Sequence, residues 1–182
     1  MRVALTGAHG VGKSTLADEL VALLKVPILP TPGRTLAARG LPVNEEATVT
    51  SQVLAWLLQY RFEREQSDWV APRSLIDVWA YTIQAAERHE PTPVESALLE
   101  ELERSTPVAV AERYDELIYI PPRIALQADE VRPSGEGFQR STDEAIVSAL
   151  ARWQIPHTTL DVRDRRAVQA LIDRLAADAS MP

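Results

Sequence analysis

The chain has 182 residues, of which 46% are hydrophobic, and its formal net charge is −7. This length and apolar content predict one folded domain, residues 1–182, and exclude a disordered chain. The absence of cysteine excludes disulfides, thiolate metal sites and cysteine nucleophiles, and the acidic charge argues against broad binding to duplex DNA, which normally needs a basic face.

No apolar run in the sequence approaches the roughly 20 residues that a bilayer-spanning helix requires. The start of the sequence, with Arg2 and soon afterwards a glycine-rich loop, lacks the pattern of a secretory signal peptide. We therefore expect a cytoplasmic protein without a membrane partner. The sequence leaves the oligomeric state open.

A glycine-rich loop follows the first predicted element, a short buried strand over residues 2–6. The loop has the P-loop spacing of a glycine, four residues and then Gly-Lys-Ser, and an apolar pattern of helical period follows it over residues 13–24. This order of strand, loop and helix predicts a nucleoside triphosphate site. The predicted binding residues are Gly7, His9, Gly10, Val11, Gly12, Lys13, Ser14 and Thr15.

Each residue type in this loop has a physical role. Glycine permits backbone dihedrals that let successive N–H groups surround a phosphate chain, and the start of the helix adds its positive dipole end. Lys13 can reach the β- and γ-phosphates of ATP or GTP, and the hydroxyl of Ser14 is a suitable ligand for Mg²⁺. The chain has only two lysines, Lys13 and Lys25, so composition alone does not explain a lysine here. We interpret His9 as a spacer.

Strands and helices are predicted to alternate along the rest of the chain. Short apolar runs at 26–29, 69–71, 117–120 and 158–160 predict four more strands. Helical patterns follow a predicted N-cap at Asn44, a capping box of Ser74 with Asp77, and another of Ser141 with Glu144. This alternation predicts an α/β fold with a five-stranded parallel sheet that helices cover on both faces.

Two further segments need separate interpretation. Trp56 and Tyr60 lie on the apolar stripe of a long helix, and we expect them to pack in the core rather than to stack on a base. Residues 121–140 are rich in proline, glycine and charge and have no periodicity. They are expected to form a cover over the ligand edge of the sheet.

Beyond the P-loop, three segments carry a family resemblance. They are residues 73–81, residues 114–122, and Asp129-Glu130-Val131-Arg132 followed by Arg140. With these segments the chain resembles a small P-loop kinase of the nucleoside and nucleotide kinase group, closest in its order of parts to ribosylnicotinamide-kinase-like P-loop (AAA-type) domains. The resemblance covers almost the whole chain, although only the P-loop is highly specific. It implies a P-loop NTPase fold, a lid over about residues 121–140, and transfer of phosphate from ATP to a small acceptor.

The resemblance also implies roles for single residues. Lys13 and the loop amides hold the donor phosphates, Ser14 binds Mg²⁺, and Arg132 and Arg140 close over the transferring group. Guanidinium groups suit this task because charge spreads over several phosphate oxygens during the transfer. Arg34 and Arg73, which follow predicted strands at the ligand edge, are predicted to bind the acceptor.

Two departures from the family pattern leave the catalytic base open. Relatives commonly carry an acidic residue where this chain has Thr31, and another where it has Pro72. Asp77 is the remaining candidate for the base, against a purely structural role in its capping box. Glu112 is a rival if residues 108–112 form a strand, but that segment fits better as the end of a helix, because the next strand begins about four residues later.

Three functions are weighed on this basis. The first is an ATP-dependent kinase that phosphorylates a hydroxyl or phosphate of a nucleoside, nucleotide or similar small molecule. In the second, the acceptor is a hydroxymethylated base in DNA, as in phage-type DNA modification, although the acidic net charge counts against it. The third is a non-metabolic nucleotide-binding switch. Because a fold constrains its substrate only weakly, the sequence does not name the acceptor.

Overall fold

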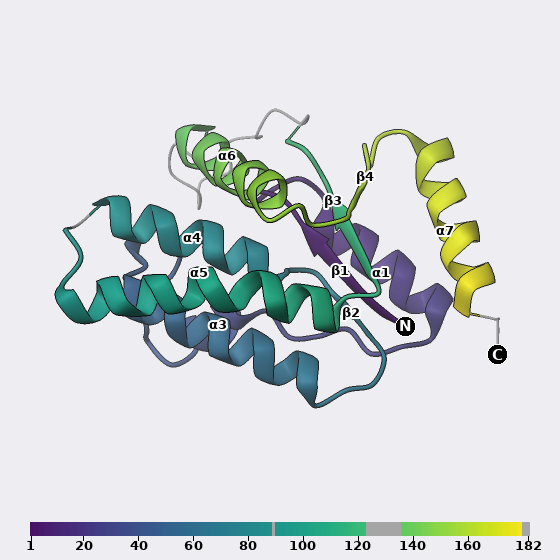
Figure 1. Cartoon of the computed structure of the whole chain (residues 1–182). Helices are drawn as coiled ribbons and strands as arrows, with labels where there is room; N and C mark the ends of the chain where they lie inside the picture. Colours follow the sequence, from purple (N-terminus) through teal and green to yellow (C-terminus); the bar gives the residue numbers. More distant parts are fainter. Residues whose placement is uncertain (89, 123–135, 180–182) are drawn as a thin grey trace.

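The computed structural model describes residues 1–88, 90–122 and 136–179 (Figure 1). Its strands are β1 (Arg2–Thr6), β2 (Trp69–Ala71), β3 (Glu116–Tyr119) and β4 (Thr158–Thr159). Its helices are α1 (Lys13–Leu24), α2 (Pro32–Ala37), α3 (Val49–Arg64), α4 (Leu75–Arg88), α5 (Pro93–Arg113), α6 (Glu136–Arg152) and α7 (Arg165–Ala179), with a 3₁₀ turn, η1, at Asn44–Glu46.

The four strands form one parallel sheet in the order β2-β1-β3-β4. In its register, Val3 of β1 lies beside Val70 of β2 on one side and Glu116 of β3 on the other. All strands therefore end at the same edge, from which the P-loop and the β2–α4 connection emerge. This is the edge at which open α/β sheets bind their ligands.

The sequence predicts five strands, but the sheet formed by the described residues has four. Residues 26–29 make only an isolated bridge, in which Ile28 pairs with Val70. Pro27 and Pro30 flank the segment, and proline has no N–H to donate to a ladder. The sequence therefore contains the apolar run of a strand without the donors needed to extend one.

Helices cover both faces of the sheet, as predicted (Figure 1). Helices α3, α4, α5 and α6 share one apolar cluster with Ala4 and Leu117, whereas α1 and α7 share the other with Val3 and Leu5. Successive residues of β1 thus point into different layers, which is the period-two geometry of a strand buried on both sides. Trp56 is confirmed as a core residue, and its indole N–H donates to the hydroxyl of Thr106 at 3.0 Å.

Two helix starts differ from their predictions. Helix α3 begins at Val49, because Thr48 and Ser51 form its capping box, while Asn44 lies in η1 with a φ of 56°. Helix α6 includes Ser141, whose hydroxyl donates to the carbonyl of Phe138 at 3.3 Å, so Ser141 is no cap. The expected lid over 121–140 lies largely outside the described residues, and its last residues, 136–140, belong to α6.

The bounds of α1 and the helical end of α5 agree with the sequence pattern. Helix α1 has the predicted bounds, and α5 continues through Pro107 to Arg113, which confirms that residues 108–112 are helical. Asp164 caps α7, since its carboxylate accepts from the N–H groups of residues 166 and 167. Within residues 1–88, 90–122 and 136–179, none of the helices is both long and apolar enough to cross a membrane.

Candidate nucleotide-binding site

The P-loop connects β1 to α1 through backbone conformations that glycine provides. Gly7, Gly10 and Gly12 have φ values of 147°, 77° and 97°. A Cβ atom on Gly7 would lie 2.4 Å from the carbonyl oxygen of Ile120, so a side chain at this position would collide with the backbone after β3. Helix α1 starts directly after Gly12, which places its unpaired first-turn N–H groups at the loop. The loop is therefore built to hold an anion.

Lys13 is folded into the loop and is only 7% exposed. Its ammonium donates to the carbonyl of Gly7 and, at 2.6 Å, to that of Ala8, and it lies 3.7 Å from a carboxylate oxygen of Asp77. Burial lowers the pKa of Lys13 to about 8, against the opposing effect of Asp77. A buried ammonium that is held largely by neutral carbonyls gains from any anion that enters the loop.

The other predicted loop residues serve different purposes. Ser14 and Thr15 are exposed on the first turn of α1, where their hydroxyls are accessible to a ligand, while Val11 is buried in the core beneath the loop. The carbonyl of His9 accepts a hydrogen bond from the amide of Gln139 at 2.8 Å, and its ring lies 5.8 Å from that of Phe138. His9 thus ties the loop to α6.

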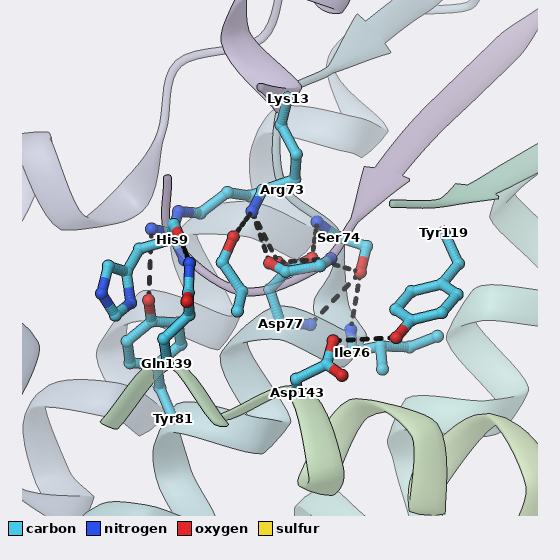
Figure 2. Close-up of polar contacts among 12 residues, drawn as sticks. His9, Lys13, Arg73, Ser74, Ile76, Asp77, Tyr81, Tyr119, Gln139 and Asp143 are labelled. Carbon is cyan, nitrogen blue, oxygen red and sulfur yellow. Dashed lines mark hydrogen bonds and ion pairs between the residues drawn. The ribbon is translucent and has the colours of Figure 1, made fainter. Parts of the chain in front are cut away.

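Asp77, in the first turn of α4, is completely buried and points toward the P-loop (Figure 2). One carboxylate oxygen accepts from the N–H of Gly7 at 3.3 Å. The other accepts from the N–H of Ser74 at 2.9 Å and from its hydroxyl at 2.8 Å, and the Ser74 hydroxyl in turn accepts from the N–H of Asp77 at 3.2 Å. The predicted capping box is therefore present, and the same carboxylate also anchors the P-loop.

Arg73 lies in the β2–α4 connection and is half-buried beside the P-loop (Figure 2). Its guanidinium carbon is 4.9 Å from the centre of the Tyr81 ring, and its positive charge contributes to the lowered pKa of Lys13. The structure thus brings Lys13, Asp77 and Arg73 together. Arg34 on α2 and Arg140 on α6 are exposed, and Arg132 lies outside the described residues.

Asp143 on α6 is a second carboxylate at this edge, and the sequence analysis missed it. Its carboxylate accepts from the phenol of Tyr119, the last residue of β3, at 2.8 Å. Burial raises the pKa of Asp143, and its charge in turn raises that of Lys13. No local motif marks this residue. It reaches the site because α6 packs on α4, where Gln84 donates to the hydroxyl of Thr142 at 2.8 Å.

Glu112 lies at the opposite edge of the sheet. It is exposed near the end of α5, and its carbonyl accepts from the guanidinium of Arg2 at 3.0 Å. Arg2 begins β1, whereas the P-loop follows the end of β1. The distance between the two edges removes Glu112 from the candidates for a catalytic base.

Comparison with known proteins agrees with this geometry. A family model described as the AAA domain matches residues 2–166, which include the P-loop, the β2–α4 connection and most of the rest of the chain. The chain belongs to the AAA domain family. A search of curated proteins finds no match.

Solved structures share the fold of this AAA domain along its whole length. NadR protein in complex with NAD and AMP-PNP has a TM-score of 0.69 at 18% identity, covering 100% of the chain and 50% of NadR. Deoxyadenosine kinase from M. mycoides with bound dCTP has a TM-score of 0.68 at 14% identity, covering 97% and 100%. YorR protein from Bacillus subtilis, in complex with phosphorylated GDP, has a TM-score of 0.62 at 14% identity, covering 100% and 99%.

These likenesses establish the fold. The chain spans about half the length of NadR but nearly the full length of the deoxyadenosine kinase and of YorR. The predicted P-loop NTPase fold, with helices on both faces of a parallel sheet, is confirmed.

Proposed function

We propose that this AAA domain is an ATP-dependent phosphotransferase that moves the γ-phosphate to a hydroxyl or phosphate group of a nucleoside, a nucleotide or a similar small molecule. The observation that carries the proposal is the P-loop: glycines with positive φ surround a buried lysine at the start of a helix. The fold shared with a protein described as a deoxyadenosine kinase supports a kinase rather than a switch.

Different residues of the P-loop bind different parts of the donor nucleotide and its metal. Lys13 exchanges its two carbonyl partners for phosphate oxygens, and the backbone N–H groups of the loop and of α1 donate to the same phosphates. The hydroxyl of Ser14, exposed on the first turn of α1, is the residue that would hold Mg²⁺. The metal, when bound, neutralises charge on the phosphates.

The two carboxylates of the site take different roles in this proposal. Both oxygens of Asp77 already accept hydrogen bonds, from Gly7 and Ser74, and Asp77 is fully buried, so we assign it to positioning the P-loop and Lys13 rather than to proton transfer. Asp143 is half-buried, and burial already raises its pKa toward that of a useful general base. We assign Asp143 to accepting the proton of the acceptor hydroxyl.

The arginines bind and cover the acceptor. Arg73 is fixed beside Lys13 by its contact with Tyr81, which suits it to grip an anionic or polar acceptor. Arg34 and Arg140 are exposed, and they are proposed to reach the substrates when the site closes. The role of Arg132 over the transferring phosphate stays a prediction from the family resemblance.

The proposal is tested by incubating the protein with Mg²⁺ and γ-labelled ATP or GTP, and with separate pools of nucleosides, nucleoside monophosphates and hydroxymethylated DNA. We expect label in a nucleoside or nucleotide pool, and its loss in the Lys13→Ala variant. Label in DNA alone would replace the small acceptor by a modified base. Tight nucleotide binding with no transfer to any pool would overturn the kinase proposal in favour of a switch.

A further inference from the structure

A buried acid lies behind the candidate site, in the last turns of α3. Glu63 is completely buried. One of its carboxyl oxygens accepts two hydrogen bonds, from the amide of Gln59 at 2.7 Å and from the phenol of Tyr114 at 2.9 Å. The other oxygen, Oε2, has no hydrogen-bond partner among the described residues. An unpaired buried oxygen costs more in a charged carboxylate than in a neutral acid.

The two partners of Glu63 also hold the backbone on both sides of Ser74. The amide of Gln59 donates a second hydrogen bond, to the carbonyl of Arg73, at 3.1 Å. The phenol oxygen of Tyr114 accepts from the N–H of Leu75 at 2.8 Å. Glu63 is therefore linked to each end of the segment 73–75 through one intervening side chain. The middle residue of this segment binds Asp77, and the first residue presents its guanidinium at the site.

Burial favours the neutral form of Glu63, and the groups around it oppose this effect. Burial raises its pKa to about 7, against hydrogen bonds from Gln59 and Tyr114 and the charge of Arg113. Arg113, at the end of α5, is the charged neighbour, but its guanidinium donates to the backbone carbonyl of Glu63. Tyr114 is the titratable neighbour, and burial raises its pKa well above the ordinary value, so its phenol keeps its proton.

We propose that Glu63 is a positioning residue that, as a neutral acid, fixes the 73–75 segment through Gln59 and Tyr114, and so holds Arg73 and Asp77 in place for phosphate transfer. The inference rests on the proposed function of the site. Glu63 touches no reacting group. A proton on Oε2 removes the charge from the unpaired oxygen and leaves Oε1 to accept both hydrogen bonds.

Activity measurements separate this role from mere support of the fold. We expect Glu63→Gln, which keeps an accepting oxygen and no charge, to retain the wild-type kcat at pH 6. Glu63→Leu and Tyr114→Phe should lower kcat about tenfold. Two variants are matched controls. Glu65→Gln changes an exposed acid two residues further along the chain, and Tyr60→Phe removes the hydroxyl of a tyrosine that stacks on Trp56.

The pH profile is the readout that a purely structural residue would not move. Wild-type kcat should decline as pH rises through about 7, because ionised Glu63 places an unpaired charge in the core and so favours local opening of the end of α3 that carries the pair of hydrogen bonds. Glu63→Gln should remove this decline. Identical profiles for wild type and Glu63→Gln, or a wild-type kcat in both Glu63→Leu and Tyr114→Phe, would overturn the proposal.

A second measurement does not depend on catalysis. Amide hydrogen exchange of the 73–75 segment should be faster in Tyr114→Phe than in wild type or Tyr60→Phe, and faster in wild type at pH 8 than in Glu63→Gln at pH 8. Unchanged exchange contradicts the positioning role. If wild-type protein transfers no phosphate, the proposed function fails, and hydrogen exchange still decides whether Glu63 holds this segment.

Discussion

The two halves of the candidate site are built in different ways. The donor half is one continuous segment, residues 7–15, in which backbone geometry and a single buried lysine make the phosphate site. The proposed acceptor half combines the β2–α4 connection, α2 and α6, and its contacts join residues far apart in the chain, such as Tyr119 with Asp143. A local sequence motif can therefore specify the donor half, whereas the proposed acceptor half forms only when separate helices and loops pack together.

Removing the donor-half lysine should have the largest effect. We expect Lys13→Ala to reduce phosphate transfer on the order of 10²- to 10³-fold, as for loss of one preorganised group that stabilises developing charge. Transfer from γ-labelled ATP measures the loss. Lys25→Ala is the control, since Lys25 caps the far end of α1. Equal activity in the two variants would contradict the donor-half assignment.

Asp143→Asn tests whether the acceptor half contains the proton acceptor. We expect kcat to fall about 10²-fold, the low end of the range for general base catalysis, with the Kd for ATP unchanged. The adjacent Glu144→Gln should behave as wild type because Glu144 is exposed. A wild-type kcat in Asp143→Asn would contradict this assignment and make Asp77 the candidate for the catalytic base again.

A third prediction compares two acceptor-half arginines. Arg73→Ala should raise the KM for the acceptor and lower kcat/KM by about 10-fold or more, as expected when a charge-assisted hydrogen bond of about 1.5–3 kcal/mol is lost. Arg34→Ala should have a smaller effect, because Arg34 is exposed on α2 while Arg73 is half-buried beside Lys13. A reversed order in steady-state kinetics would show that α2, not the β2–α4 connection, grips the acceptor.

The smallest effect concerns pH. Because burial lowers the pKa of Lys13 to about 8, the free protein loses this ammonium as pH rises through 8, and ATP affinity should then fall by up to about tenfold per pH unit. Calorimetry at pH 9 in two buffers should detect proton uptake on binding.

A Lys13→Arg variant keeps its charge over this range, so its ATP affinity should not follow the same curve. In the absence of nucleotide, the unfolded state binds more protons than the folded state between pH 8 and 10.5, so the contribution of Lys13 to stability becomes less unfavourable as pH rises. Wild-type affinity that is constant from pH 7 to 9 would contradict the lowered pKa.

Two errors of the sequence analysis have physical causes. The 26–29 run has strand composition, but its prolines remove donors, and only the bridge at Ile28 forms. Ser141 with Glu144 has capping-box spacing, but α6 already includes Ser141. In both cases a correct local rule was overridden by neighbouring residues.

The sequence by itself determined the P-loop, the bounds of α1, the parallel α/β architecture and the capping box at Ser74 and Asp77, because each depends on residues close together in the chain. Only the tertiary structure decided that Asp77 also anchors Gly7, that Asp143 accepts from Tyr119 at the site and that the partners of Glu63 bind the 73–75 segment. These roles arise where separate elements meet, and burial there changes the pKa values of Lys13, Glu63 and Asp143 in ways that no local pattern records.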